Sequence, residues 1–252
     1  DKTFNVAVSN NGKLEIVLYG MGFSDLEKLG YYDLADIDYS FSEAIPAGIN
    51  KSYETLTNYM KQLKKRFPNV QSVRVNLTPV FDSLKNEINL NKPQSIVDMA
   101  LANSRARLRM TTLYYYAGIL DSLVAGTGNK VEDFGVGFYT KYGDGGVDVS
   151  PIADLLKSEV FELGYALKIP ESILNAEPSD GLFGDSRSDE DQIGASYPEL
   201  EWVMKSIEDG KSINDFQGRE REVYEIHSKF NSANKHKMNP IPVCIIPENI
   251  KH

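Results

Sequence analysis

The chain has 252 residues, of which 41% are hydrophobic and 25% are charged, a composition typical of a soluble globular protein. Its 27 basic and 36 acidic residues give a net charge of −9, which disfavours a nucleic-acid partner because the field repels phosphates. No apolar run is long enough to span a membrane, and the single cysteine, Cys244, excludes an internal disulfide, so we expect a cytoplasmic protein without a membrane partner.

Two short strands are predicted at the N-terminus. Residues 4–8 alternate between apolar and polar side chains, and residues 14–19 form a second apolar stretch. Between them stands Asn10-Asn11-Gly12, residue types that accept a positive φ and favour a tight hairpin turn. We therefore expect an antiparallel pair of strands here.

The rest of the chain alternates helical patterns with short apolar runs. We predict helices over residues 53–67, 80–87, 95–116 and 155–167, and strands over residues 70–77 and 123–126. Ser95 is expected to cap the long helix, with Ile96, Met99, Ala100 and Asn103 on its first face. This alternation predicts one α/β domain over residues 1–252, a mostly parallel sheet flanked by helices. Ligands bind such sheets at the carboxyl ends of strands, which directs attention to the loops after the first strand, after Val75 and after Ala125.

The densest chemical signal lies between residues 124 and 148. Gly126-Thr127-Gly128 leaves a strand, and Glu132 follows five residues after Thr127. Three glycines within residues 143–146, flanked by Lys141 and Asp148, let the backbone approach a ligand closely. Taken alone, such a turn is more typical of a solvated surface loop.

Three arginines, Arg105, Arg107 and Arg109, alternate along the long predicted helix. Because residues two apart do not share a helix face, at most one or two of them can point into a common site. The others are expected to form ion pairs at the surface.

Together these segments resemble the ammonia-dependent NAD synthetase family from about residue 46 to 240. The most specific match is Thr140-Lys141-Tyr142-Gly143-Asp144-Gly145-Gly146, with Asp148 two residues later. Further matches, in family order and at family-like spacing, cover residues 103–110, 126–129, 177–182 and 188–194 and the pair His236-Lys237.

The resemblance implies an adenine-nucleotide α-hydrolase-like fold and assigns a role to each matching residue. ATP would contact Ser9, Thr127, Lys157 and Ser179, Mg²⁺ would bind Glu132, and deamido-NAD would contact Arg107, Lys141, Asp148, His236 and Lys237. Lys157 and Asp148 are the expected catalytic residues. Two polyphosphate ligands need cations and a metal, and no protein nucleophile is required because the carboxylate of the substrate attacks ATP.

Several of these residues also suit plainer roles. Ser179 is typical of a turn after Pro178, the acids at 189–191 suit a solvated or helix N-terminal run, and Asp133 suits a solvated charge. His236 and Lys237 lie in a polar segment that is equally compatible with a disordered tail. Cys244 lies in an apolar run, which favours a buried, inert thiol.

The resemblance fails at the ATP loop. The family has Ser-Gly-Gly-x-Asp-Ser opening a helix whose N-terminus holds pyrophosphate. Here Ser9 is followed by Asn10-Asn11-Gly12-Lys13-Leu14, with a lysine at the position of the family's aspartate. Either a rebuilt loop still meets phosphate, or the chain is a degenerate paralogue, or its N-terminal sequence differs from the native gene. Residues 10–45 are therefore given no role.

The expected function is ATP-dependent amidation of deamido-NAD by ammonia, giving NAD, AMP and pyrophosphate through an adenylated intermediate. The 252 residues leave no room for a glutaminase domain, so free ammonia is the expected nitrogen source, and the resemblance implies a homodimer. Two alternatives remain open. One is a non-catalytic or degenerate dinucleotide-binding paralogue, and the other is a different ATP-pyrophosphatase amide ligase, which would lack the signature from Lys141 to Asp148.

Overall fold

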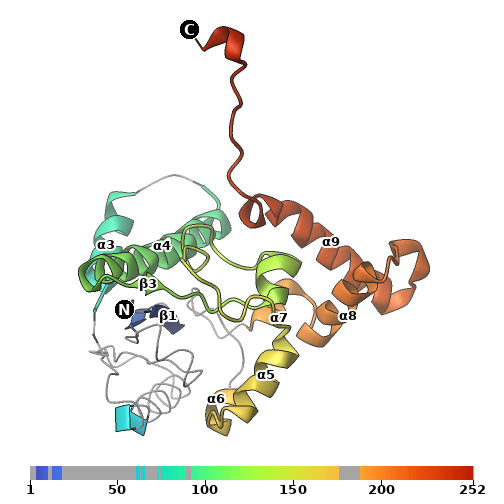
Figure 1. Ribbon diagram of the computed structural model, residues 1–252, viewed down its shortest axis with the longest axis horizontal. Helices are drawn as coiled ribbons and strands as arrows, with labels where there is room; N and C mark the ends of the chain where they lie inside the picture. Colours follow the sequence, from blue (N-terminus) through green and yellow to red (C-terminus); the bar gives the residue numbers. More distant parts are fainter. Residues whose placement is uncertain are drawn as a thin grey trace.

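The computed structural model describes most of the chain beyond residue 72. The described residues are 4–10 and 13–18, for which the backbone alone is described, together with 61–62, 64–65, 73, 75–88, 92–175 and 188–251. Strands and the long helix α4 form one side of the molecule, and helices α7, α8 and α9 form the other (Figure 1).

Three strands form the described sheet, in the order β2-β1-β3. Strand β1 (Phe4–Asn10) pairs antiparallel with β2 (Lys13–Leu18), and Asn10 lies opposite Lys13. Strand β1 also pairs parallel with β3 (Leu123–Val124), and Ala125 forms a parallel bridge with Val149. The predicted antiparallel pair is confirmed. The described strands contain one parallel and one antiparallel pairing, so the mostly parallel sheet stays a prediction.

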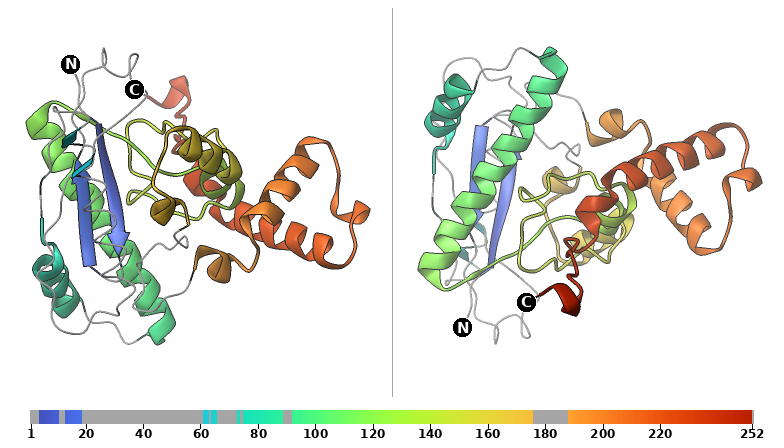
Figure 2. Two further views of the ribbon diagram at one scale, coloured as in Figure 1. Left: turned by 90° about the horizontal axis from the view of Figure 1, so that it is seen from below. Right: turned by 90° about the horizontal axis from the view of Figure 1, so that it is seen from above.

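Helix α4 (Gln94–Leu120) packs across β1 and β2 (Figure 2). The prediction that Ser95 caps this helix is wrong. Pro93 precedes the first turn, no side chain caps that turn, and Ser95 lies inside the helix. The predicted first face is also wrong. Ile96 and Met99 are 57% and 52% exposed, whereas the buried positions are Ala102, Ala106, Arg109, Leu113 and Ala117. Small alanine side chains let this face lie close to its neighbours, whereas Ile96 and Met99 are largely exposed.

The other predicted elements have mixed outcomes. Helix α3 (Thr78–Glu87) begins two residues before the predicted start, and α5 (Lys157–Ala166) falls within the predicted range. The predicted strand at 70–77 is wrong where it is described, because Val73 and Val75 lie in irregular chain. Their alternation reflects burial, since both pack against an apolar core. The predicted helix at 53–67 lies largely outside the described residues, and 61–62 and 64–65 are helical.

Two apolar cores hold these elements together. The first lies between α3, α4 and β3 and includes Phe81, Leu113 and Val124. The second lies under η1 (Val131–Val136), a turn of π-helix, and includes Val131, Leu200 and Val223. The remaining elements are α6 (Glu171–Leu174), α7 (Asp189–Ile193), α8 (Tyr197–Glu208), η2 (Ile213–Asp215), α9 (Gly218–Met238) and η3 (Glu248–Ile250).

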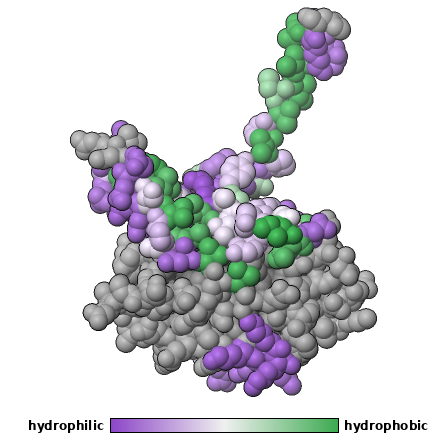
Figure 3. All heavy atoms as spheres, turned by 90° about the vertical axis from the view of Figure 1, so that its left-hand side faces the viewer, coloured by the Kyte–Doolittle hydropathy of each residue, from purple (hydrophilic) through white to green (hydrophobic). Residues whose placement is uncertain are grey.

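The C-terminal tail after α9 extends away from the body, and its apolar side chains are visible in Figure 3. Val243 and Ile245 are 80% and 86% exposed, and Cys244 between them is exposed as well. The expectation of a buried thiol is therefore wrong, because the apolar run forms no helix or strand that packs on a core. Among the described residues, no helix combines the length and the apolar character needed to cross a membrane.

His227 on α9 gives the fold a pH dependence. Its side chain is 6% exposed, neither ring nitrogen has a hydrogen-bond partner, and burial lowers its pKa below the ordinary value of 6.5. Below that value the unfolded chain binds a proton that the folded chain does not, so stability falls as the pH drops, by up to about 1.4 kcal/mol per pH unit.

We predict that His227→Leu flattens this part of the pH dependence. Urea unfolding at about pH 7.5 and about pH 5.5 gives the loss of unfolding free energy with falling pH for each protein, and we expect the smaller loss for His227→Leu. Parallel losses of stability in the two proteins would show that His227 does not contribute.

Candidate active site

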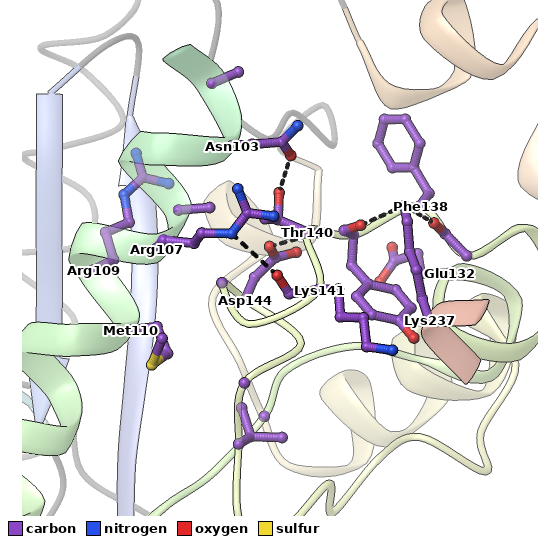
Figure 4. Close-up of a pocket in the computed structure, with 18 of the residues that line it drawn as sticks. Asn103, Arg107, Arg109, Met110, Glu132, Phe138, Thr140, Lys141, Asp144 and Lys237 are labelled. Atoms are coloured by element: carbon purple, nitrogen blue, oxygen red, sulfur yellow. Dashed lines mark hydrogen bonds between the residues drawn. The ribbon is translucent and has the colours of Figure 1, made fainter. Parts of the chain in front are cut away.

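A pocket of about 760 Å³ opens where β3 ends (Figure 4). Its lining comes from α4, from the loop that follows β3, from Glu132 on η1, from residues 137–147, from α7 and from the end of α9. Ala125, Gly126 and Thr127 all line it, so the loop after Ala125 lies where a ligand site was predicted.

The glycine turn is packed tightly against α4. A Cβ added at Gly143 would lie 2.8 Å from the Cβ of Ala106, and one at Gly146 would lie 2.8 Å from Cγ of Met110. The amide of Thr140 donates to Asp144 Oδ1 at 2.9 Å. These glycines therefore let the turn lie close to α4, and because both also line the pocket, their close approach to a ligand stays a prediction.

Cationic side chains from distant segments meet at this turn. Lys141 Nζ donates to the backbone carbonyl of His236 at 2.6 Å, and Arg107 Nε donates to the carbonyl of Lys141 at 3.3 Å. Lys237 Nζ donates to the carbonyls of Gly137 at 2.9 Å and Tyr139 at 2.7 Å. His236 and Lys237 lie within α9, so the alternative of a disordered polar tail is wrong.

The arginines of α4 divide as their spacing predicts. Arg107 and the buried Arg109 line the pocket, whereas the Arg105 guanidinium lies 4.4 Å from the centre of the Phe81 ring. Burial lowers the pKa of Lys237, and the charge of Asp144 opposes that shift. The pocket lining thus combines four cationic side chains, Arg107, Arg109, Lys141 and Lys237, with three acids, Glu132, Asp144 and Asp189.

A second group of polar residues surrounds Glu132 on η1. Lys157 Nζ lies 2.9 Å from Glu132 Oε1, and the Tyr197 hydroxyl donates to the same oxygen at 2.7 Å. The amide of Asn129 donates to Oε2 at 3.4 Å. The side chains of Lys157 and Glu132 are only 19% and 16% exposed. Lys157, predicted to bind phosphate, and Glu132, predicted to bind Mg²⁺, therefore form a largely desolvated ion pair.

Asp148 has a different environment from the other predicted residues. Its Oδ2 accepts from the amide of Val124 at 2.8 Å, and its Oδ1 accepts from the Tyr114 hydroxyl at 3.0 Å. Burial and this carboxylate raise the pKa of Tyr114 to about 12. Asp148 therefore ties β3 to α4 beside the pocket, and its catalytic role stays a prediction. Ser179 and the side chain of Ser9 lie outside the described residues, although Ser9 pairs with Leu14 through the backbone.

Two acids differ from the sequence-based expectation of solvated charges. Asp189 is 8% exposed and lines the pocket. Burial, with the charges of Glu132 and Asp144, raises the pKa of Asp133 to about 7. Both depend on tertiary contacts that no local pattern reveals.

The helix N-terminal position predicted for residues 189–191 is confirmed, because all three acids lie in the first turn of α7, and Asp191 forms a reciprocal cap with Ser188. Tyr197 was missed entirely, since nothing in its sequence surroundings distinguishes it from a core tyrosine.

The carboxylates of Glu132 and Asp189 fit a magnesium ion that is bound together with phosphates. The Tyr197 hydroxyl lies 2.7 Å from Glu132 Oε1 and 3.4 Å from Asp189 Oδ2, which places two carboxylates at one edge of the pocket. Within the described part of the chain, no three or more His, Cys, Asp or Glu residues are placed to hold a metal by themselves. Mg²⁺ is commonly held by one or two carboxylates together with substrate phosphates and water.

The sequence matches the family model for NAD synthase over residues 45–241. The chain is 40% identical over 151 residues to the NH(3)-dependent NAD(+) synthetase of Carboxydothermus hydrogenoformans, a match over 60% of this chain and 61% of that protein. It is 38% identical over 208 residues to the protein of the same name from Alkaliphilus metalliredigens, over 82% of this chain and 74% of that protein. The match to the Archaeoglobus fulgidus protein covers 56% of it, so the chain spans under two thirds of several curated relatives.

Two solved structures resemble the fold. The NMN synthetase of Francisella tularensis has a TM-score of 0.59 and 28% identity, over 76% of this chain and 72% of that one. The NH3-dependent NAD synthetase of Campylobacter jejuni has a TM-score of 0.55, over 75% of this chain and 72% of that one. At 22% identity, the second likeness concerns the fold alone.

Proposed function

Because the chain belongs to the NAD synthase family, we propose that it amidates deamido-NAD with ATP and ammonia, giving NAD, AMP and pyrophosphate. The observation that carries this proposal is the convergence of Arg107, Arg109, Lys141 and Lys237 on a pocket that also contains Glu132. Ammonia as the nitrogen source is supported by the names of the curated relatives.

The reaction proceeds in two steps. The carboxylate of deamido-NAD attacks the α-phosphorus of ATP, which forms an acyl adenylate and releases pyrophosphate. Ammonia then attacks the acyl carbon, AMP leaves with its bonding electron pair, and the nitrogen releases one proton to solvent. Neither step needs a nucleophile from the protein, so the protein contributes positioning and electrostatic stabilisation.

The side chains divide between the two ligands. Arg107, Lys141, His236 and Lys237 face deamido-NAD, and Thr127 and Lys157 face ATP, where Lys157 binds the phosphates. Bound to Glu132 and the ATP phosphates, Mg²⁺ would neutralise charge that develops on the leaving pyrophosphate. Ser9, Ser179 and Asp148 complete the proposed set, with Asp148 acting beside the pocket.

The surrounding architecture is part of the same proposal. We infer a mostly parallel sheet flanked by helices, of the adenine-nucleotide α-hydrolase type, supported by the likeness to the Francisella structure. We also infer a homodimer, because Tyr115 and Ile119 on the last turns of α4 are 63% and 62% exposed. A cytoplasmic location fits a biosynthetic enzyme of this kind.

The function is tested by incubating the chain with deamido-NAD, ATP, Mg²⁺ and ammonia and measuring NAD, AMP and pyrophosphate in equal amounts. NMN is measured as well, since one structural relative is an NMN synthetase. Binding of deamido-NAD without any product would instead favour the non-catalytic, dinucleotide-binding alternative. Pyrophosphate release that needs a different acceptor would favour another amide ligase.

Substrate recognition gives the first prediction for this site. Lys141→Ala should weaken deamido-NAD binding by ~1–3 kcal/mol, the range for a hydrogen bond to a charged group, and leave ATP binding nearly unchanged. Calorimetric titration with each ligand measures both affinities, and Lys229→Ala, on the exposed side of α9, is the control. An unchanged deamido-NAD affinity would remove Lys141 from the site, and equal losses for both ligands would indicate a structural role.

The neighbouring acids Glu132 and Asp133 give the second prediction. Glu132→Gln should lower turnover strongly and raise the Mg²⁺ concentration needed for half-maximal NAD formation, because an amide binds Mg²⁺ more weakly than a carboxylate. Asp133→Asn should have a small effect, since burial already favours the neutral form of that side chain. Equal effects on the Mg²⁺ requirement would contradict the assignment of Glu132 as the metal ligand.

The N-terminal strands give the third prediction. The backbone groups of β1 and β2 pair with each other from Asn5–Leu18 to Asn10–Lys13, so they are not directed at a phosphate. We expect ATP to bind more weakly than deamido-NAD and turnover to be low. Separate titrations of the two ligands compare these affinities. Tighter binding of ATP than of deamido-NAD would mean that the rebuilt loop holds phosphate.

A further inference from the structure

Tyr197 contacts both members of the Glu132–Lys157 ion pair. Its hydroxyl lies 2.7 Å from Glu132 Oε1, and Lys157 Nζ lies 4.6 Å from the centre of its ring. The side chain is 5% exposed. The family resemblance assigns Tyr197 no role, and the proposed reaction does not use it.

The hydroxyl has one proton and two carboxylates within reach. It donates to Glu132 at 2.7 Å, and Asp189 Oδ2, at 3.4 Å, is a longer, second acceptor. A tyrosine hydroxyl has one proton to donate, and the shorter of the two contacts assigns it to Glu132. Glu132 Oε1 therefore accepts two hydrogen bonds, one from a cation and one from a neutral hydroxyl.

The position of this hydroxyl is fixed by the core. Tyr197 begins α8 and belongs to the apolar cluster that contains Leu200, Val203 and Val223. Its backbone amide donates to Glu190 Oε1 at 2.7 Å, which joins the start of α8 to α7. A donor held in this way directs a neighbouring carboxylate without the entropy cost of ordering a flexible side chain.

We propose that Tyr197 is a positioning residue, whose hydroxyl orients the Glu132 carboxylate toward Mg²⁺–ATP and whose ring keeps the Lys157 ammonium beside it. This inference rests on the proposed function. The hydroxyl supplies the outer-shell hydrogen bond that ligand carboxylates typically receive. The ring also gives the Lys157 ammonium a cation–π contact, 4.6 Å from the ring centre, which holds this charge beside Glu132.

The test replaces the hydroxyl and keeps the ring. For Tyr197→Phe, thermal unfolding is followed with millimolar ATP over a range of Mg²⁺ concentrations, without deamido-NAD or ammonia, so that no turnover occurs. We expect the Mg²⁺ concentration for half-maximal stabilisation to rise about 10–100-fold, the usual effect of losing an outer-shell partner. The affinity for deamido-NAD, measured by calorimetry, should not change.

Tyr165→Phe is the matched control, because Tyr165 on α5 is 59% exposed. A Mg²⁺ response in Tyr197→Phe equal to that of the wild type would overturn the positioning role and leave the proposed function intact. A parallel loss of deamido-NAD affinity would also overturn it, since that would indicate a general packing defect. If Mg²⁺ does not change the thermal stability of the wild-type protein at millimolar ATP, both the proposed metal site and the proposed function are wrong.

Discussion

Two lysine side chains hold the end of α9 against the glycine turn, and the pocket depends on this contact. Lys237 donates to the carbonyls of Gly137 and Tyr139, and Lys141 donates to the carbonyl of His236, between segments 95 to 100 residues apart in the sequence. Neutral carbonyls satisfy the hydrogen-bonding geometry of an ammonium without cancelling its charge. The contact therefore closes the pocket and also leaves positive charge at its edge, as an anionic ligand requires.

The glycine turn supports that contact from the other side. Gly143 and Gly146 approach Ala106 and Met110 so closely that a Cβ would collide, which fixes Lys141 relative to α4. Arg107 then bonds the carbonyl of Lys141. Charged side chains from α4, the turn and α9 are thus joined by hydrogen bonds into one group, whereas Glu132, Lys157 and Tyr197 form another beside the second core. A reaction between two polyphosphate ligands needs both groups at one cavity.

The sequence predicted many of the residues that line the pocket, but it did not predict the packing that holds them in place. The motif around Lys141 and the His236-Lys237 pair led to the pocket because their order and spacing are specific to a family. The buried face of α4 was missed because alanines carry little periodic signal, although they allow the close approach. Asp189 and Tyr197 were missed because their burial arises from the packing of α7 and α8, which local patterns do not encode. The hairpin of β1 and β2 was predicted correctly because its turn chemistry is local.

We propose that this pocket binds a dinucleotide through Lys141, Arg107 and Lys237. A crystal structure of the chain with deamido-NAD tests it most directly. We expect electron density for the dinucleotide between α4 and the end of α9, with its anionic groups within hydrogen-bonding distance of those three side chains. Density for deamido-NAD at a different place on the molecule, with this pocket holding only water, would contradict it.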